Sequence, residues 1–156
     1  MKKRKNWKVL ILTLLVVYLV AFIGSIFTSS NTNTEWYNSI KPSITPPNWV
    51  FPIVWNVLFF LIALSLYFSW IGSKKENRTK IALVFGINLV LNVLWSFLFF
   101  SLKNPLLSFF EIILLELSIL SMILITFKIN KISSYLLWPY LLWVFFAGIL
   151  NFLMAF

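Results

Sequence analysis

The chain has 156 residues, 61% of them hydrophobic and 11% charged, whereas soluble domains are usually about 45 to 50% apolar, so it belongs in a lipid bilayer. It contains neither His nor Cys, which excludes disulfides, Ser/His/Asp and Cys/His nucleophiles, ordinary zinc sites and the usual haem ligands other than Met or Tyr, and no metal site is expected. The net charge of +9 would suit nucleic acid, but the placement of the basic residues indicates a membrane topology instead.

Long uncharged stretches predict the spans. Crossing the hydrocarbon core takes roughly 20 apolar residues per helix, and five such stretches are present. We predict an all-α membrane protein, in which one domain of residues 1–156 forms a bundle of five transmembrane helices with a long ordered loop between the first two. The predicted helices cover about residues 7–27, 51–71, 80–101, 105–127 and 134–155.

The first helix follows a basic N-terminus, which would also suit a signal peptide. Its apolar run is longer than a typical signal core of about 7 to 15 residues, and no small-x-small cleavage site follows it, which favours a span. Eleven of the thirteen basic residues fall on one side of the predicted bundle. By the positive-inside rule the N-terminus is cytoplasmic and the C-terminus outside, and these residues are expected to contact lipid headgroups rather than nucleic acid. They are Lys2, Lys3, Arg4, Lys5, Lys8, Lys74, Lys75, Arg78, Lys80, Lys128 and Lys131.

The segment between the first two helices is rich in indoles and prolines. Pro42, Pro46 and Pro47 fall within six residues and forbid a continuous helix there, because each lacks a backbone donor and biases its predecessor toward extended conformations. We expect an ordered loop over the mouth of the bundle. Trp36 and Tyr37 in this loop are candidates for ligand recognition, since rigidly presented loops often carry binding residues.

The second and third helices carry aromatic and amide side chains at helical spacing. Trp55 and Phe59 lie one turn apart in the second. An Asn in hydrocarbon is costly unless its amide is hydrogen-bonded, so the stripe in the third helix should face the bundle interior. Interhelical hydrogen bonding alone, worth on the order of 0.6 kcal/mol per bond, remains an alternative role for the amides. The stripe comprises Asn88, Asn92, Trp95, Ser96 and Phe99.

Two further features lie in the third and fourth helices. Ala82 and Gly86 form a small-xxx-small pair that suits a homodimer interface, although this spacing is frequent by chance. Glu111 and Glu116 are the ionisable residues deepest within a span, which makes them functional candidates. Five positions place them roughly 140° apart on an ideal helix, so they do not form a paired-carboxylate site, and protonation or contacts with Ser stay open.

The fifth helix repeats the aromatic and amide pattern with Tyr140, Trp143, Ala147 and Asn151. With the predicted topology, its stripe and those of the second and third helices meet at one depth, in an outward-opening cavity under the loop. Trp and Tyr also serve as simple anchors at membrane interfaces, and this reading is preferred for Trp7, Trp70 and Trp138.

These residues, in this order over nearly the whole chain, resemble the tryptophan-rich sensory protein family, the bacterial branch related to the mitochondrial translocator protein, or peripheral benzodiazepine receptor. The pattern is highly specific. It comprises Trp36-Tyr37, Lys41-Pro42, Pro46-Pro47, Val50-Phe51-Pro52, Trp55, Asn88, Asn92, Trp95-Ser96, Phe99-Phe100, Pro139-Tyr140, Trp143, Ala147 and Leu150-Asn151.

The resemblance implies a five-helix bundle, usually dimeric, in the bacterial cell membrane, that binds tetrapyrroles such as protoporphyrin IX and requires no cofactor. In animal members it also implies cholesterol and synthetic ligands, but the cholesterol-recognition stretch beyond the fifth helix has no counterpart before Phe156, so sterol binding through that stretch is not expected. Carried over by position, the ligand site includes Tyr37, Pro46, Trp55, Phe59, Asn92, Trp95, Ser96, Phe99, Trp143 and Ala147.

Three functions remain open: a porphyrin-binding protein that senses stress or regulates tetrapyrrole levels, an enzyme that degrades porphyrin in light, and a transporter of tetrapyrroles or lipids. Some family members are reported to degrade porphyrin in light, and for this chemistry Trp55 and Trp143 are the expected redox-active pair. Transport has the least support from the sequence, which shows no obvious inverted repeat or broken helix.

Overall fold

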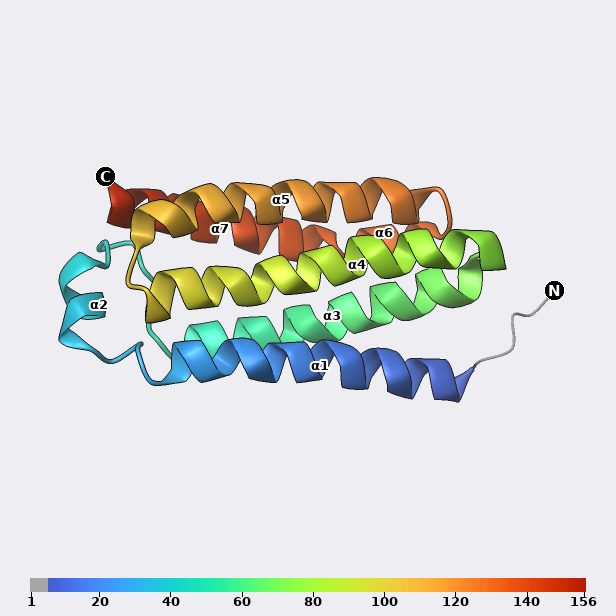
Figure 1. Ribbon diagram of the computed structural model, residues 1–156, viewed down its shortest axis with the longest axis horizontal. Helices are drawn as coiled ribbons and strands as arrows, with labels where there is room; N and C mark the ends of the chain where they lie inside the picture. Colours follow the sequence, from blue (N-terminus) through green and yellow to red (C-terminus); the bar gives the residue numbers. More distant parts are fainter. Residues whose placement is uncertain (1–5) are drawn as a thin grey trace.

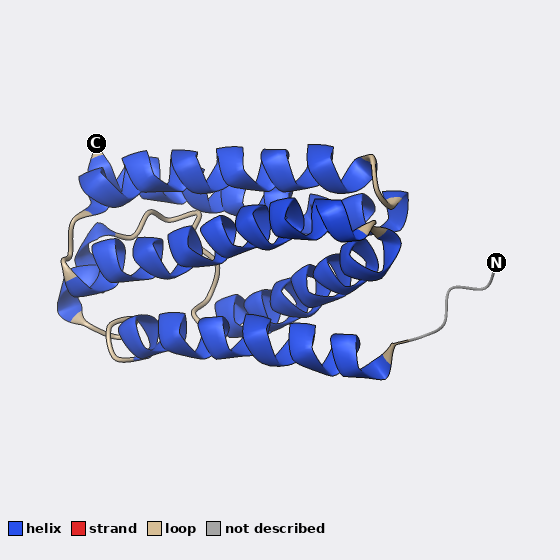
Figure 2. Ribbon diagram, turned by 45° about the vertical axis from the view of Figure 1, so that its right-hand side comes forward, coloured by secondary structure: helices blue, strands red, loops and turns tan. Residues whose placement is uncertain are grey.

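The computed structural model describes residues 6–156, so the basic residues at positions 2–5 lie outside the described part. Five long helical segments lie alongside one another in an elongated bundle (Figure 1). Helices and loops make up the whole of residues 6–156 (Figure 2). The helices are α1 (Trp7–Ser29), α2 (Glu35–Ile40), α3 (Val50–Gly72), α4 (Lys75–Ser96), α5 (Pro105–Phe127), α6 (Lys131–Tyr135) and α7 (Trp138–Ala155), and a π-helical turn, η1 (Phe97–Ser101), continues α4.

The prediction of a five-helix membrane bundle is confirmed, since five helical segments of residues 6–156 are long and apolar enough to cross a bilayer. Helix α1 packs on α3 and α4, and α5 packs on α4 and α7. Large apolar side chains such as Leu15, Leu83 and Leu142 cover the outer surface of the bundle, as expected of helices that face lipid.

The structure differs from the prediction in two helices and in the loop. Helix α4 begins at Lys75 rather than near residue 80, with Glu76 in its first turn, where a carboxylate is favourable to the helix dipole. The final span is interrupted at residues 136–137, between α6 and α7. Pro139 lies in the first turn of α7, where its missing N–H removes a hydrogen bond that a continuous helix would need. The loop contains the short helix α2, which begins where the side chain of Thr34 accepts a hydrogen bond from the backbone N–H of Tyr37 at 3.3 Å.

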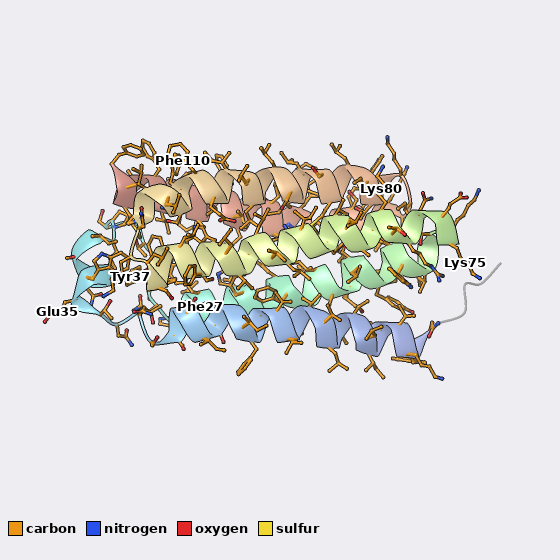
Figure 3. All side chains as sticks on the ribbon, in the orientation of Figure 1. Phe27, Glu35, Tyr37, Lys75, Lys80 and Phe110 are labelled. Carbon is orange, nitrogen blue, oxygen red and sulfur yellow. The ribbon has the colours of Figure 1, made fainter. Side chains whose placement is uncertain are left out.

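The two ends of the bundle differ in composition. The loop end carries residues 30–49 and 102–104 together with the C-terminus, and the basic end carries residues 73–74 and 128–130 together with the start of α1 (Figure 1). Side chains drawn as sticks show Glu35 and Tyr37 at the loop end and Lys75 and Lys80 at the basic end (Figure 3). All described basic residues other than Lys41 and Lys103 therefore belong to the basic end.

Hydrogen bonds between serines close the basic half of the bundle. The Ser65 hydroxyl donates to the carbonyl of Ser133 at 2.8 Å, and the Ser133 hydroxyl donates to the carbonyl of Ser65 at 2.6 Å. Ser69 also contacts the Ser133 hydroxyl, and Ser134 donates to the carbonyl of Ile123 at 3.0 Å. These hydroxyls are all buried and hold the short helix α6 against α3 and α5.

Candidate functional site

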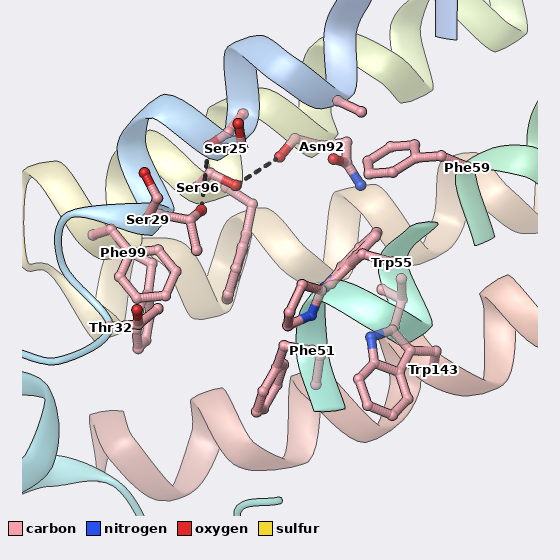
Figure 4. A pocket seen from close by; sticks show the side chains of 18 of the residues that line it. Ser25, Ser29, Thr32, Phe51, Trp55, Phe59, Asn92, Ser96, Phe99 and Trp143 are labelled. Carbon is pink, nitrogen blue, oxygen red and sulfur yellow. Dashed lines mark hydrogen bonds between the residues drawn. The ribbon is translucent and has the colours of Figure 1, made fainter. Parts of the chain in front are cut away.

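A cavity of about 720 Å³ occupies the loop half of the bundle. Its walls come from α1, α3, α4, η1 and α7, with one face of α5 below and α2 at the loop end. Phe51, Trp55 and Trp143 lie on one side of this space, across from Ser96 and Phe99 (Figure 4). No charged side chain of residues 6–156 lines it, so the cavity suits an apolar ligand with a few polar groups.

The structure brings together nine of the ten ligand-binding residues expected from the resemblance. Tyr37, Trp55, Phe59, Asn92, Trp95, Ser96, Phe99, Trp143 and Ala147 all line the cavity. Pro46 lies outside this lining. The loop instead contributes Asn48, whose side-chain amide donates to the carbonyl of Thr32 at 3.1 Å and so ties the end of the loop to its beginning.

Three indoles from three different helices reach the cavity. Trp95 lies nearly parallel to Phe99, with ring centroids 5.1 Å apart and an interplanar angle of 15°. Trp55 packs against Phe59 at 5.4 Å, and Trp143 meets Phe51 edge to face at 5.8 Å. The cavity wall thus presents several aromatic faces, on which a flat ligand can stack.

The indole nitrogens differ in their hydrogen bonding. Trp95 Nε1 donates to Asn151 Oδ1 at 2.9 Å, and Asn151 Nδ2 donates in turn to the carbonyl of Pro105 at 2.7 Å. This chain fixes Trp95 against α7 and the start of α5. Trp143 Nε1 is buried and has no hydrogen-bond partner among the described residues, so the donor of this cavity-lining residue is unsatisfied in the free protein.

Beneath the cavity, three helices share a buried polar network. Asn92 Nδ2 donates to the Tyr140 hydroxyl at 3.2 Å, and that hydroxyl donates to Asn88 Oδ1 at 3.3 Å. Asn88 Nδ2 donates to the Ser118 hydroxyl at 2.8 Å. The amides thus hydrogen-bond between helices, the alternative role that the sequence left open. Asn92 has both roles, because it also lines the cavity.

Glu111 and Glu116 take no part in this hydrogen-bonded network. Glu111 is buried, and neither of its carboxyl oxygens has a hydrogen-bond partner within residues 6–156. One carboxyl oxygen of Glu116 is also buried without a partner among these residues. The contacts with Ser that the sequence left open are therefore not formed by Glu111. Neither residue lines the cavity.

Aromatic side chains cover the loop end of the cavity. Trp36 and Tyr37 of α2 pack edge to face on Phe99, with centroids 5.6 and 6.4 Å away, and Tyr37 also packs on Phe100 at 5.9 Å. Tyr37 is only 5% exposed, and burial raises the pKa of its phenol above the usual 10.0. We call α2 with these packed rings the lid helix.

The wall is incomplete between α1 and α3. Phe22, Ser25 and Asn56 line the cavity and are also exposed on the outside of the bundle. Tyr18, at this same opening, donates its hydroxyl hydrogen bond to the carbonyl of Asn56 at 3.0 Å and joins the two helices there. The cavity therefore opens sideways toward lipid, while the lid helix covers its end.

Sequence reasoning missed the contribution of α1. Ser25, Thr28 and Ser29 of α1 line the cavity, and their spacing of three and one residues places them on one helical face. Thr32, in the turn that follows α1, also lines it. That polar stripe in an otherwise apolar helix was a usable signal. Trp7, Trp70 and Trp138, interpreted as interface anchors, do not line the cavity.

The proposed dimer face is open in the single chain. Ala82 is exposed, and a Cβ added to Gly86 would meet no atom within 4 Å. This surface of α4 has room for a second helix to approach closely. The homodimer itself remains a prediction.

Comparison with known proteins settles the family. A model of the TspO/MBR family matches residues 12–156. The chain belongs to the TspO/MBR family. It is 41% identical over 144 residues to the tryptophan-rich protein TspO of Archaeoglobus fulgidus, which covers 92% of each chain. It is also 39% identical to the TspO of Chlorobaculum tepidum, covering 85% of each chain, and 27% identical to the human translocator protein, covering 86% of this chain and 80% of the human one.

Proposed function

We propose that this protein binds a tetrapyrrole such as protoporphyrin IX in the cavity at its loop end and acts as a sensory or regulatory protein of the membrane. The observation that carries the proposal is the convergence of Trp55, Trp95 and Trp143 on one apolar chamber. Its volume of about 720 Å³ falls within the usual 300 to 1,000 Å³ of small-molecule sites.

The chemistry of the wall favours a metal-free ring. Aromatic faces can stack on a flat macrocycle, and Asn92 and the unpartnered Trp143 Nε1 can meet its polar groups. The chain has no His or Cys to ligate haem iron. We further propose that the protein functions as a homodimer in a bacterial cell membrane, with the basic end toward the cytoplasm.

A titration of the purified protein with protoporphyrin IX in darkness, followed by absorbance and by quenching of Trp fluorescence, tests the binding proposal. Trp143→Leu should weaken binding about tenfold or more, because it removes both a stacking face and a donor. Trp138→Leu on the same helix is the matched control, since Trp138 is 47% exposed and does not line the cavity. Absence of saturable binding by the unmodified protein would refute the proposal.

Light-dependent degradation of bound porphyrin is a second candidate, favoured by the contact of Trp55 and Trp143 with the same cavity. In this reaction dioxygen adds across a double bond of the light-excited ring, the C–C bond between those two carbons breaks, and both oxygen atoms remain in the open-chain product. An indole donates an electron to the excited ring and regains it before the product leaves. The double variant Trp55→Phe, Trp143→Phe should retain part of the binding but lose the light-dependent bleaching. Bleaching of bound porphyrin at an unchanged rate would remove this candidate, and porphyrin flux across sealed vesicles would indicate transport instead.

A further inference from the structure

Two lysines flank the lid helix. Lys41 follows α2 directly, and its Nζ lies 5.8 Å from the centroid of the Tyr37 ring. Lys103 lies in the turn between η1 and α5, and its Nζ lies 5.9 Å from the Trp36 ring. Two cations from distant parts of the sequence thus contact adjacent rings of one short helix.

Both ring systems connect these cations to the cavity. Trp36 and Tyr37 pack on Phe99, and Tyr37 and Phe99 line the cavity. No charged side chain of residues 6–156 lines the cavity itself. A ligand that carries charged groups must therefore keep them at the rim, because an unpaired charge in the apolar chamber would be strongly destabilising.

The charge at this rim is positive. Lys41 and Lys103 are the basic residues of the loop end, and Glu35 is the acidic residue of α2. The remaining described Lys and Arg residues belong to the basic end of the bundle. Carboxylates held at the loop end would meet an excess of positive charge there.

The backbone of Lys103 is unusual. Its φ is 49°, and it is the single non-glycine residue within residues 6–156 that has a positive φ. Lys has no intrinsic preference for this left-handed region, which Gly or Asn adopts more easily. Strained backbone is concentrated at ligand sites and switch regions, so this position suggests that the side chain is used.

We infer that Lys41 and Lys103 bind two carboxylates carried on one edge of the ligand, while the flat apolar ring lies in the cavity below. The inference rests on the proposed function and narrows the ligand to a tetrapyrrole that carries two carboxylates. In the free protein the ammonium groups lie over Tyr37 and Trp36, and carboxylates of a bound ligand take over as their partners. An exposed ammonium–carboxylate pair contributes modestly and is screened by salt.

The test compares protoporphyrin IX with its dimethyl ester, which has the same ring without the two negative charges. The full-length protein in discs of zwitterionic lipid is titrated with each compound, for the variants Lys41→Gln, Lys103→Gln and their combination. Lys74→Gln and Lys128→Gln at the basic end are matched controls, because they remove the same charge far from the cavity.

We expect each loop-end substitution to weaken binding of the free acid about two- to fivefold, and the double substitution to combine both effects. Binding of the ester should be unchanged by these substitutions, and Lys103→Arg should retain affinity for the acid. Added salt should weaken binding of the acid but not binding of the ester. An equal loss for acid and ester would overturn the inference, since the lysines would then merely support the lid helix through their aromatic contacts. Unchanged acid binding in the double variant would also overturn it, whereas failure of the unmodified protein to bind either compound would refute the proposed function itself.

Discussion

The loop half and the basic half of the bundle are built from the same helices but packed in opposite ways. At the basic half, Ser65, Ser69 and Ser133 are completely buried and mutually hydrogen-bonded. At the loop half, large indoles surround a chamber, and the buried nitrogen of Trp143 has no partner among the described residues. Small side chains allow close helix approach, whereas bulky rings on facing helices hold a space open.

This contrast predicts that the basic half contributes mainly to the stability of the fold and the loop half mainly to ligand binding. The buried serines of the basic half fill their space and satisfy their polar groups, so a change there should cost folding free energy. Residues of the loop half border an empty volume, so a change there should alter ligand affinity with less effect on folding. Substitutions of equal chemistry at the two ends can test the distinction directly.

The largest effect is expected from placing a phenyl ring in each half. Ala63 is completely buried in the aliphatic core, and Ala63→Phe should destabilise the fold by about 3 kcal/mol or more through overpacking, lowering the yield of monodisperse protein and its melting temperature. Ala147 borders the cavity, and Ala147→Phe should keep the melting temperature while weakening porphyrin binding roughly tenfold or more. Equal melting temperatures for the two variants would show that the halves are not packed differently.

A smaller loss of stability is expected from the serine cluster. Ser133→Val removes the hydroxyl that donates to the Ser65 carbonyl and that contacts the buried Ser69 hydroxyl. Loss of these two hydrogen bonds should cost about 2 kcal/mol. Ser121 is exposed and bonds only within its own helix, so Ser121→Val is the control with little effect. Thermal unfolding in detergent measures both. If the folded fraction of Ser133→Val bound porphyrin more weakly than the unmodified protein, the basic half would also contribute to binding, and the proposed division between the two halves would be wrong.

The hydrogen bonds of Asn151 lie at the boundary between the two roles. Asn151→Ala leaves the half-buried Trp95 nitrogen without its partner and removes one of the hydrogen bonds accepted by the Pro105 carbonyl, which the Ser108 hydroxyl still contacts. The change should cost about 1 kcal/mol of stability. Because Trp95 then loses its fixed orientation, porphyrin binding should weaken as well. A red shift of Trp fluorescence checks the reorientation, and an unchanged spectrum with unchanged affinity would argue that stacking on Phe99 alone positions this indole.

The sequence predicted the spans and most of the site because hydrophobic length and helical spacing are local properties. Trp55, Trp95 and Trp143 were placed on inward stripes by periodicity, and the structure brings them to one cavity. It did not predict that Ser25 and Thr28 of α1 would form part of the wall, because their helical spacing is a weak signal in a helix of such high apolar content. The side opening at Asn56 depends on how α1 and α3 approach each other, which no single-helix pattern encodes.

The smallest expected effect concerns the pH dependence of the lid helix. Burial raises the pKa of Tyr37 above 10.0, whereas the phenol of the unfolded chain ionises near pH 10. Unfolding therefore releases a proton once the pH passes about 10, and the stabilisation present below that pH is lost as the pH rises toward the folded pKa. Melting temperatures of the unmodified protein should fall more steeply above pH 10 than those of Tyr37→Phe, with parallel curves between pH 7 and 9. Curves that stay parallel to pH 11 would show that the phenol is accessible to water in the folded protein.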